Sequence, residues 1–231
     1  MPLRTFLLKA SWLLLIPIVD SLYLLLNHST ERVYLLITII DQRIPFLPYF
    51  IIPYVAWYGL LFVALIWFMS YSFQLYRSSI LSMILGLAIC FIIFSFFQTT
   101  VPRPDTLGHD IFSRLTQVIY TIDQPFNAFP SIHVLTAYVI FLGSLKMSIH
   151  SPKISLMIQS SVILVILSTL FLKQHTLLDV LGGLLLGGSL FKTFNWFEVT
   201  LAKRKEMYKL FPNEVTINPN ENDPFLELGK R

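Results

Sequence analysis

Residues 79–97 read SILSMILGLAICFIIFSFF, a stretch of nineteen residues without a charged side chain. An α-helix of about 20 apolar residues is long enough to cross the hydrocarbon core of a bilayer. The stretch therefore predicts a membrane-spanning helix and decides the class of fold. It also contains Cys90, the one cysteine of the chain, so no internal disulfide can form.

The composition of the whole chain agrees with a membrane protein. Of the 231 residues, 55% are hydrophobic and 13% are charged, whereas a soluble domain carries about 25% charged residues. The membrane is therefore the first predicted partner. Basic and aromatic residues are not interleaved as they are in nucleic-acid-binding segments, so no nucleic-acid partner is predicted.

Further apolar segments lie on both sides of residues 79–97. We predict an all-α, polytopic bundle of six transmembrane helices, at about Trp12–Leu26, Phe50–Met69, Ser79–Phe97, Ser131–Leu145, Ile154–Leu172 and Thr176–Phe194. In the long connection Gln98–Pro130, apolar residues on one helical face predict a short helix that lies on the membrane surface or packs against the bundle: Ile111, Phe112, Leu115, Val118 and Ile119. Residues 1–194 would form the membrane domain, and residues 195–231 a polar cytoplasmic tail.

The basic residues predict the orientation of these six helices. Ten lie on the side that carries both termini: Arg4, Lys9, Arg77, Lys146, Lys153, Lys192, Lys203, Arg204, Lys205 and Lys209. Five lie on the other side: Arg32, Arg43, Arg103, Arg114 and Lys173. Because basic residues are enriched in cytoplasmic loops, both termini are predicted to be cytoplasmic and the long connection to lie outside the cell membrane.

On this outer side, the stretch Lys173-Gln174-His175-Thr176-Leu177-Leu178-Asp179 carries the first chemical pattern. On a helix, His175 and Asp179 would share one face, because they are four residues apart. The carboxylate could then accept the Nδ1 proton and make Nε2 of the imidazole a better base or nucleophile. The alternative is that both residues only cap a helix end at the membrane surface.

A second pattern, Asn127-Ala128-Phe129-Pro130-Ser131-Ile132-His133, stands where the fourth span begins. Proline and serine are both favoured at a helix start. The free N–H groups of that first turn, among them that of Ile132, form a natural site for a phosphate group. Ser131 adds a hydroxyl donor and His133 an imidazole. A capped membrane helix with an interfacial histidine is the alternative.

A third pattern is Val101-Pro102-Arg103-Pro104-Asp105. The flanking prolines stiffen an extended backbone, so the Arg103 guanidinium is presented in a restricted position. A guanidinium in such a place can bind two phosphate oxygens at once. An arginine at a membrane surface can also simply bind lipid headgroups, and the pattern alone does not separate the two.

The order and spacing of these patterns resemble the type 2 phosphatidic acid phosphatase superfamily of membrane lipid phosphatases, over about Phe50–Phe194. The matching positions are Arg103-Pro104, Pro130-Ser131, His133, Ser168, His175 and Asp179. The sequences around Ser131 and His175 resemble those of the branch that includes inositol phosphorylceramide synthase-like proteins. The chain departs from the family at Phe96, Ile132 and Thr169, where the family has lysine, glycine and arginine. Lys173 or Gln98 could replace one of the missing phosphate ligands.

The resemblance implies a phosphatase that needs no cofactor and no metal. His175 would attack the phosphorus atom of a phospholipid or polyprenyl phosphate, Asp179 would orient His175, and His133 would protonate the leaving oxygen. Arg103, Ser131, Ile132 and Lys173 would bind the phosphate. Three alternatives remain open. They are a phosphotransferase acting on an alcohol, a metal hydrolase with a facial triad of the two histidines and the aspartate, and a lipid-binding protein without activity.

Overall fold

The computed structural model describes residues 4, 8, 10–28 and 32–210. In chain order, its elements are η1 Ser11–Leu14, α2 Leu15–Leu26, β1 Tyr34–Leu35, α3 Ile39–Arg43, η2 Pro48–Phe50, α4 Ile51–Tyr71, α5 Phe73–Phe96, β2 Thr99–Thr100, α6 Ile111–Ile122, α7 Ile132–Met147, α8 Pro152–Phe171 and α9 Leu177–Leu210.

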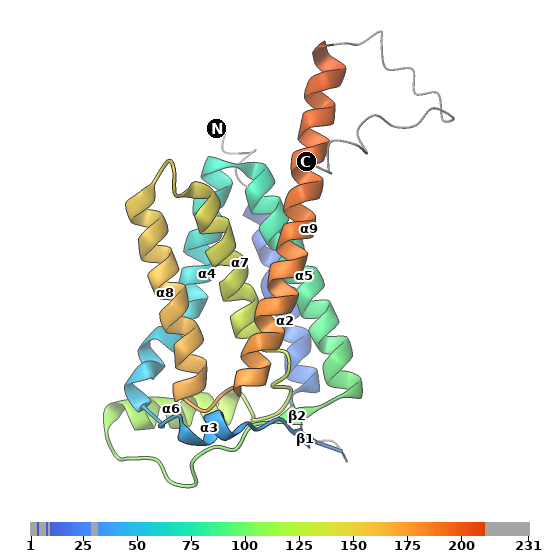
Figure 1. Cartoon of the computed structure of the whole chain (residues 1–231). Coiled ribbons are helices and arrows are strands. Elements are labelled where there is room, and N and C mark those ends of the chain that lie inside the picture. The colour runs from blue at the N-terminus through green and yellow to red at the C-terminus, as the bar shows by residue number, and fades with distance from the viewer. Residues whose placement is uncertain (1–3, 5–7, 9, 29–31, 211–231) are drawn as a thin grey trace.

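The long helices stand side by side in a bundle, while α3, α6 and the two strands lie together across one end of it (Figure 1). α7 is the central helix, because it packs against α4, α5, α8 and α9. Its residues Val134, Leu135 and Val139 are fully buried. α9 projects beyond the bundle at the end opposite to α3 and α6.

Two glycines bring the backbone of α9 directly against α7. A Cβ atom at Gly183 would lie 2.7 Å from the carbonyl oxygen of Ser131, and one at Gly187 would lie 2.8 Å from that of Leu135. Only glycine permits such a close backbone approach. The start of α9 is thereby held beside the start of α7, and these two helix starts carry the histidine patterns.

Four helices in the described part of the chain are long and apolar enough to cross a membrane: Pro48–Tyr71, Phe73–Phe96, Pro152–Phe171 and Leu177–Met207. A predominantly helical membrane protein is thus confirmed. Two expected spans are shorter, since α2 has 12 residues and α7 has 16. At 1.5 Å per residue, neither covers the ~30 Å hydrocarbon core by itself, and the count of six spans stays a prediction.

The start of α5 and the extent of α9 differ from the predicted helix boundaries by more than two residues. α5 begins at Phe73, not at Ser79, because Ser72 caps it by accepting the N–H of Leu75. The polar residues at its start are tolerated because Arg77 pairs with Glu198 of α9, with Nε 2.7 Å from Oε1.

α9 runs through residue 195, where the predicted tail starts, and extends to Leu210, the last described residue. No glycine or proline follows Phe194 until Pro212, so nothing in this stretch breaks the helix. The rest of the predicted tail, residues 211–231, lies outside the described residues.

The helix predicted in the long connection is present as α6. Along its apolar stripe, Ile111, Leu115 and Val118 are exposed, whereas Phe112 and Ile119 pack against a buried cluster that includes Tyr54 and Leu172. One part of the stripe therefore belongs to the core. The location of the other part at a membrane surface stays a prediction.

The strand pair was not anticipated from the sequence. β1 and β2 pair in parallel, with Tyr34 opposite Thr99 and Leu35 opposite Thr100. Strands of two residues leave no alternating pattern to detect. The pairing ties the segment before α3 to the segment that leads to Arg103.

Candidate active site

The two predicted histidines meet at the end of the bundle where α7 and α9 begin. His133 is in the first turn of α7, and His175 lies two residues before α9. Nε2 of His175 is 3.5 Å from Nδ1 of His133. Both side chains are buried, with 8% and 6% of their surface exposed. Residues 42 positions apart in the chain thus form one imidazole pair.

The orientation of His175 is set by a backbone carbonyl. Its Nδ1 lies 3.1 Å from the oxygen of Ala128. Because a carbonyl can only accept, this hydrogen bond holds the proton on Nδ1 and leaves the lone pair on Nε2, which faces His133. His175 therefore has the predicted proton on Nδ1 and lone pair on Nε2. The acceptor that fixes them is the carbonyl of Ala128, which residue spacing could not identify.

The predicted hydrogen bond between His175 and Asp179 is not formed. The Asp179 Oδ2 atom is 3.7 Å from His175 Nδ1, which is too long for a hydrogen bond but close enough for a strong charge interaction. The prediction of a shared helical face was wrong because α9 begins only at Leu177.

Asp179 instead belongs to a capping box at the start of α9. Its Oδ2 accepts the N–H of Thr176 at 2.6 Å, and the hydroxyl oxygen of Thr176 lies 3.4 Å from the N–H of Asp179. The Oδ1 atom is buried and has no hydrogen-bond partner among the described residues. The carboxylate is thus a helix cap whose charge also reaches His175.

His133 is held between aromatic rings. Its ring centroid is 4.9 Å from that of Tyr54 and 4.4 Å from that of Trp57. The Trp57 indole is fixed in turn by donating to the hydroxyl of Thr136, one turn further along α7, at 3.1 Å. These contacts restrict the imidazole to one orientation beside His175.

Ser131 caps α7 as predicted. Its Oγ accepts the N–H of Val134 at 3.3 Å, and its own N–H donates to the carbonyl of Asp179 at 3.1 Å. The side chain is fully buried. The N–H groups of Ile132 and His133 belong to the first turn and therefore have no acceptor within the helix. Together with the positive end of the helix dipole they can receive an anion.

The Arg103 guanidinium is held by three oxygen atoms. Nη1 donates to the carbonyl of Tyr120 at 3.1 Å, and Nη2 donates to the carbonyl of Asp123 at 2.7 Å and to Oε1 of Gln174. The guanidinium also lies 4.0 Å from the centre of the Tyr120 ring. Burial lowers the pKa of Arg103, and the charge of Asp123 opposes this effect.

Two donor atoms, one on Arg103 and one on its neighbour Gln174, have no hydrogen-bond partner among the described residues. They are the buried Nε of Arg103 and the buried Nε2 of Gln174. Buried donors are nearly always satisfied by protein, water or ligand. Both would suit an acceptor such as a phosphate oxygen. Sequence reasoning did not single out Gln174, although it stands next to His175.

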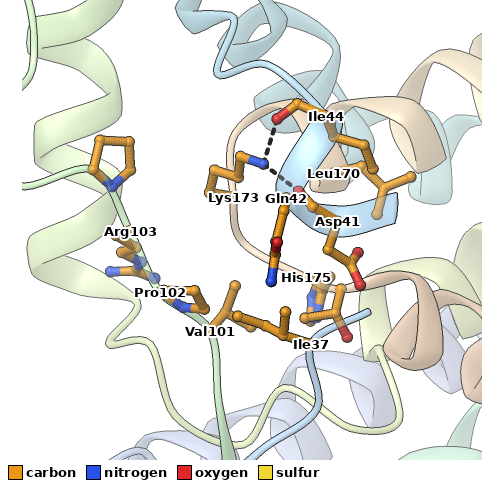
Figure 2. A pocket seen from close by; sticks show the side chains of 12 residues that line it. Ile37, Asp41, Gln42, Ile44, Val101, Pro102, Arg103, Leu170, Lys173 and His175 are labelled. Carbon is orange, nitrogen blue, oxygen red and sulfur yellow. Dashed lines mark hydrogen bonds between the residues drawn. The ribbon is translucent and has the colours of Figure 1, made fainter. Parts of the chain in front are cut away.

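Lys173 points toward α3. Its Nζ donates to the carbonyl oxygens of Asp41 at 3.0 Å and Ile44 at 2.5 Å (Figure 2). Burial lowers the pKa of Lys173, and the charge of Asp41 opposes this. Its backbone is left-handed, with φ of 51°, because the N–H groups of Lys173 and Gln174 bond back to Leu170 and Thr169 and close α8 in a Schellman motif. The other suggested substitute ligand, Gln98, donates to His28 and Asn127.

Each histidine of the pair lines a cavity of its own. One, of about 280 Å³, is lined by Arg103, Lys173, His175 and residues of α3. The other, of about 310 Å³, is lined by His133, Asp123 and a set of aromatic side chains: Tyr23, Tyr54, Trp57 and Tyr58. His175 therefore belongs to a cavity with basic residues, and His133 to an aromatic one.

A metal centre is not indicated by the geometry of the described part of the chain. No group of three or more His, Cys, Asp or Glu residues there is placed to hold a metal ion. The arrangement instead offers two imidazoles, a carboxylate and several N–H donors. Such groups can support nucleophilic attack, proton transfer and binding of an anion.

Comparison with known proteins gives one match. A family model described as the PAP2 superfamily matches residues 75–202, which is more than half of the chain. No curated protein and no solved structure matches the chain. The matched segment contains Arg103, Ser131, His133, His175 and Asp179.

Proposed function

The chain belongs to the PAP2 superfamily, and on that premise we propose that it is a membrane lipid-phosphate phosphatase that acts through a phosphohistidine on His175. Membership of the superfamily indicates phosphatase or phosphotransferase activity. The observation that carries the finer proposal is the buried imidazole pair, in which Nε2 of His175 faces Nδ1 of His133 at 3.5 Å.

In the first step, Nε2 of His175 attacks phosphorus. A nitrogen–phosphorus bond forms while the bond between phosphorus and the oxygen of the lipid breaks, and His133 gives a proton to that oxygen. In the second step, His133 takes a proton from water. The water oxygen bonds to phosphorus, the nitrogen–phosphorus bond breaks, and phosphate leaves. The charge of Asp179 stabilises the positive ring of His175 in both steps.

The phosphate oxygens are bound by fixed donors. The start of α7 supplies Ser131 and the N–H of Ile132, and Arg103 supplies its charge and its Nε–H. An ammonium group carries three N–H bonds, and the carbonyls of Asp41 and Ile44 accept two of those on Lys173. The third bond and the positive charge are available to the phosphate. These donors do the electrostatic work, so the proposed reaction uses no metal ion.

A transfer reaction is the second candidate, and the aromatic cavity supports it. In an in-line mechanism, the group that receives the phosphoryl group enters from the side on which the lipid alcohol left. His133, which gives its proton to the leaving oxygen, lines the aromatic cavity. An alcohol bound there could replace water in the second step. The resemblance to inositol phosphorylceramide synthase-like proteins is part of this candidate.

The reaction takes place on the outer side of the cell membrane in this mechanism, with both termini in the cytoplasm. The excess of basic residues on the side of the termini, ten against five, supports this orientation. The substrate is a phospholipid or a polyprenyl phosphate, because such lipids present a phosphate at headgroup level on apolar chains.

The test is phosphate release from a panel of lipid phosphates by the full-length protein, with and without an alcohol acceptor. We expect His175→Ala to abolish turnover and His133→Ala to lower it by about 10²–10⁴-fold. His150→Ala is the matched control, because this exposed histidine contacts Tyr71 and not the histidine pair. A parent protein that neither releases nor transfers phosphate, or a His175→Ala variant with parental turnover, contradicts the proposal.

A further inference from the structure

α3 is a short helix that cannot be stable by itself. It has five residues, Ile39–Arg43, far fewer than an isolated helix needs. Its apolar side chains do not anchor it either, since Ile39 and Ile40 are 72% and 61% exposed. Other contacts must therefore hold it at the end of the bundle, and they converge on Asp41.

Asp41 is buried and its carboxylate accepts three hydrogen bonds. Oδ2 accepts the N–H and the hydroxyl of Thr38 at 2.8 Å and 2.6 Å, which forms the capping box of α3. Oδ1 accepts the N–H of Leu177, the first residue of α9, at 2.8 Å. One carboxylate thus caps two helices that are more than 130 residues apart in the chain.

The same residue holds the other side of the His175 turn. The backbone carbonyl of Asp41 accepts the Lys173 ammonium at 3.0 Å, and Figure 2 shows this ammonium pointing to α3. Lys173 stands two residues before His175, and Leu177 stands two residues after it. Asp41 therefore contacts the chain on both sides of the proposed nucleophile.

We propose that Asp41 is a positioning residue for His175, and that it and Lys173 fasten α3 to the turn that carries this imidazole. The inference rests on the proposed function. His175 precedes α9, so the regular hydrogen bonds of that helix do not hold it. The N–H of His175 bonds to the carbonyl of Thr169 in α8 at 3.1 Å, and Asp41 adds one contact on each side of His175. Asp41 also lines the cavity shared by Lys173 and His175, so a ligand in this cavity lies against Asp41.

Two carboxylates, those of Asp179 and Asp41, lie at the start of α9, and each accepts a different backbone N–H. Asp179 accepts the N–H of Thr176, and Asp41 accepts that of Leu177. Both charges lie at the positive end of the α9 dipole, where they are stabilising. Because Asp41 satisfies the Leu177 N–H, the Asp179 carboxylate stays over Thr176, 3.7 Å from His175.

The test compares Asp41→Asn with two controls in the full-length protein. Asparagine keeps one acceptor oxygen, but its NH₂ group must face the backbone N–H of either Thr38 or Leu177, and both of these groups are donors. Asp110→Asn is the control, because Asp110 also caps a helix, as the N-cap residue of α6, but makes no contact with the His175 turn. Thr38→Val removes the hydroxyl contact of α3 while the bond from Asp41 to Leu177 remains.

We expect Asp41→Asn to lower kcat by about 10²-fold, typical of a misplacement near 1 Å, with little change in KM. Hydrogen exchange of the peptide spanning residues 173–179 should become faster. Asp110→Asn should change neither quantity, and Thr38→Val should lower kcat much less than Asp41→Asn. Asp41→Glu, which restores a carboxylate, should recover part of the kcat.

Three results would overturn the proposal: parental kcat in Asp41→Asn, a loss of kcat without faster exchange at residues 173–179, or an equal loss in Thr38→Val. Thermal unfolding of each variant identifies one that fails to fold, in which case Asp41→Glu and Thr38→Val carry the comparison. The exchange measurement needs no substrate. A parent protein without turnover would therefore contradict the proposed function, while hydrogen exchange still tests whether Asp41 holds the turn that carries His175.

Discussion

Replacing Asp179 by asparagine separates the two tasks of this carboxylate. As a helix cap, Asp179 accepts the N–H of Thr176 at 2.6 Å, and an asparagine oxygen can do the same. As a charge, it lies 3.7 Å from Nδ1 of His175, and asparagine removes that charge. The substitution should therefore leave the fold intact and reduce the reactivity of His175.

The magnitude follows from the distance. Two unit charges near 4 Å interact by about 4 kcal/mol at an effective dielectric constant of about 20. The amide dipole of asparagine retains part of this, so we expect a loss of roughly 2 kcal/mol when the His175 ring becomes positive. At 1.36 kcal/mol per factor of ten, kcat should fall by about 30-fold. The free energy of unfolding should change by less than about 1 kcal/mol, because the cap persists.

The assay measures phosphate release and thermal unfolding side by side for the parent, Asp179→Asn and Asp179→Ala. Alanine removes both the cap and the charge, so this variant should lose kcat and also ~0.5–2 kcal/mol of stability. Parental kcat in Asp179→Asn would refute the reasoning and leave Asp179 as a helix cap alone. A large loss of stability in Asp179→Asn would show that the asparagine oxygen does not replace the carboxylate.

Arg103→Leu should lower kcat/KM by about 10²–10³-fold, as expected for a lost preorganised donor. Arg103→Lys should keep the charge and part of the activity. If both variants are as active as the parent, Arg103 does not bind the phosphate. Activity should survive EDTA, and its loss with recovery by one divalent ion would favour the facial triad. In a Cys90→Ser background, an impermeant thiol reagent should label Gln117→Cys in intact cells and Lys205→Cys only after permeabilisation; the reverse pattern overturns the orientation. The pKa of Asp110 is lowered, mainly by a side-chain hydrogen bond from the third residue of α6. The contribution of Asp110 to stability is therefore present above the ordinary pKa of about 3.9 and is lost as the pH falls through the lower pKa of the folded state. The difference in Tm between the parent and Asp110→Asn should be present at pH 7 and disappear in acid.

The class of fold and the chemical patterns could be predicted because both depend on neighbouring residues. An apolar run such as residues 79–97 must be helical in a bilayer, since its backbone groups have no other hydrogen-bond partners there. Pro130 and Ser131 mark a helix start for equally local reasons, and the structure begins α7 at Ile132. The roles of the site residues came from motif chemistry and await the experiments above.

The partners of each site residue depend on the tertiary structure. His175 bonds to Ala128, Arg103 to Gln174, and Lys173 to Asp41, across 47, 71 and 132 positions of the chain. No periodicity or spacing rule reaches so far. The sequence identified His175 and Asp179 as a pair, but the helix boundary at Leu177 decided that they do not share a helical face. Local sequence determines which helices form and which groups they carry. The packing of α3, α7 and α9 determines which of those groups meet, because a hydrogen bond forms only where both partners are held within about 3 Å.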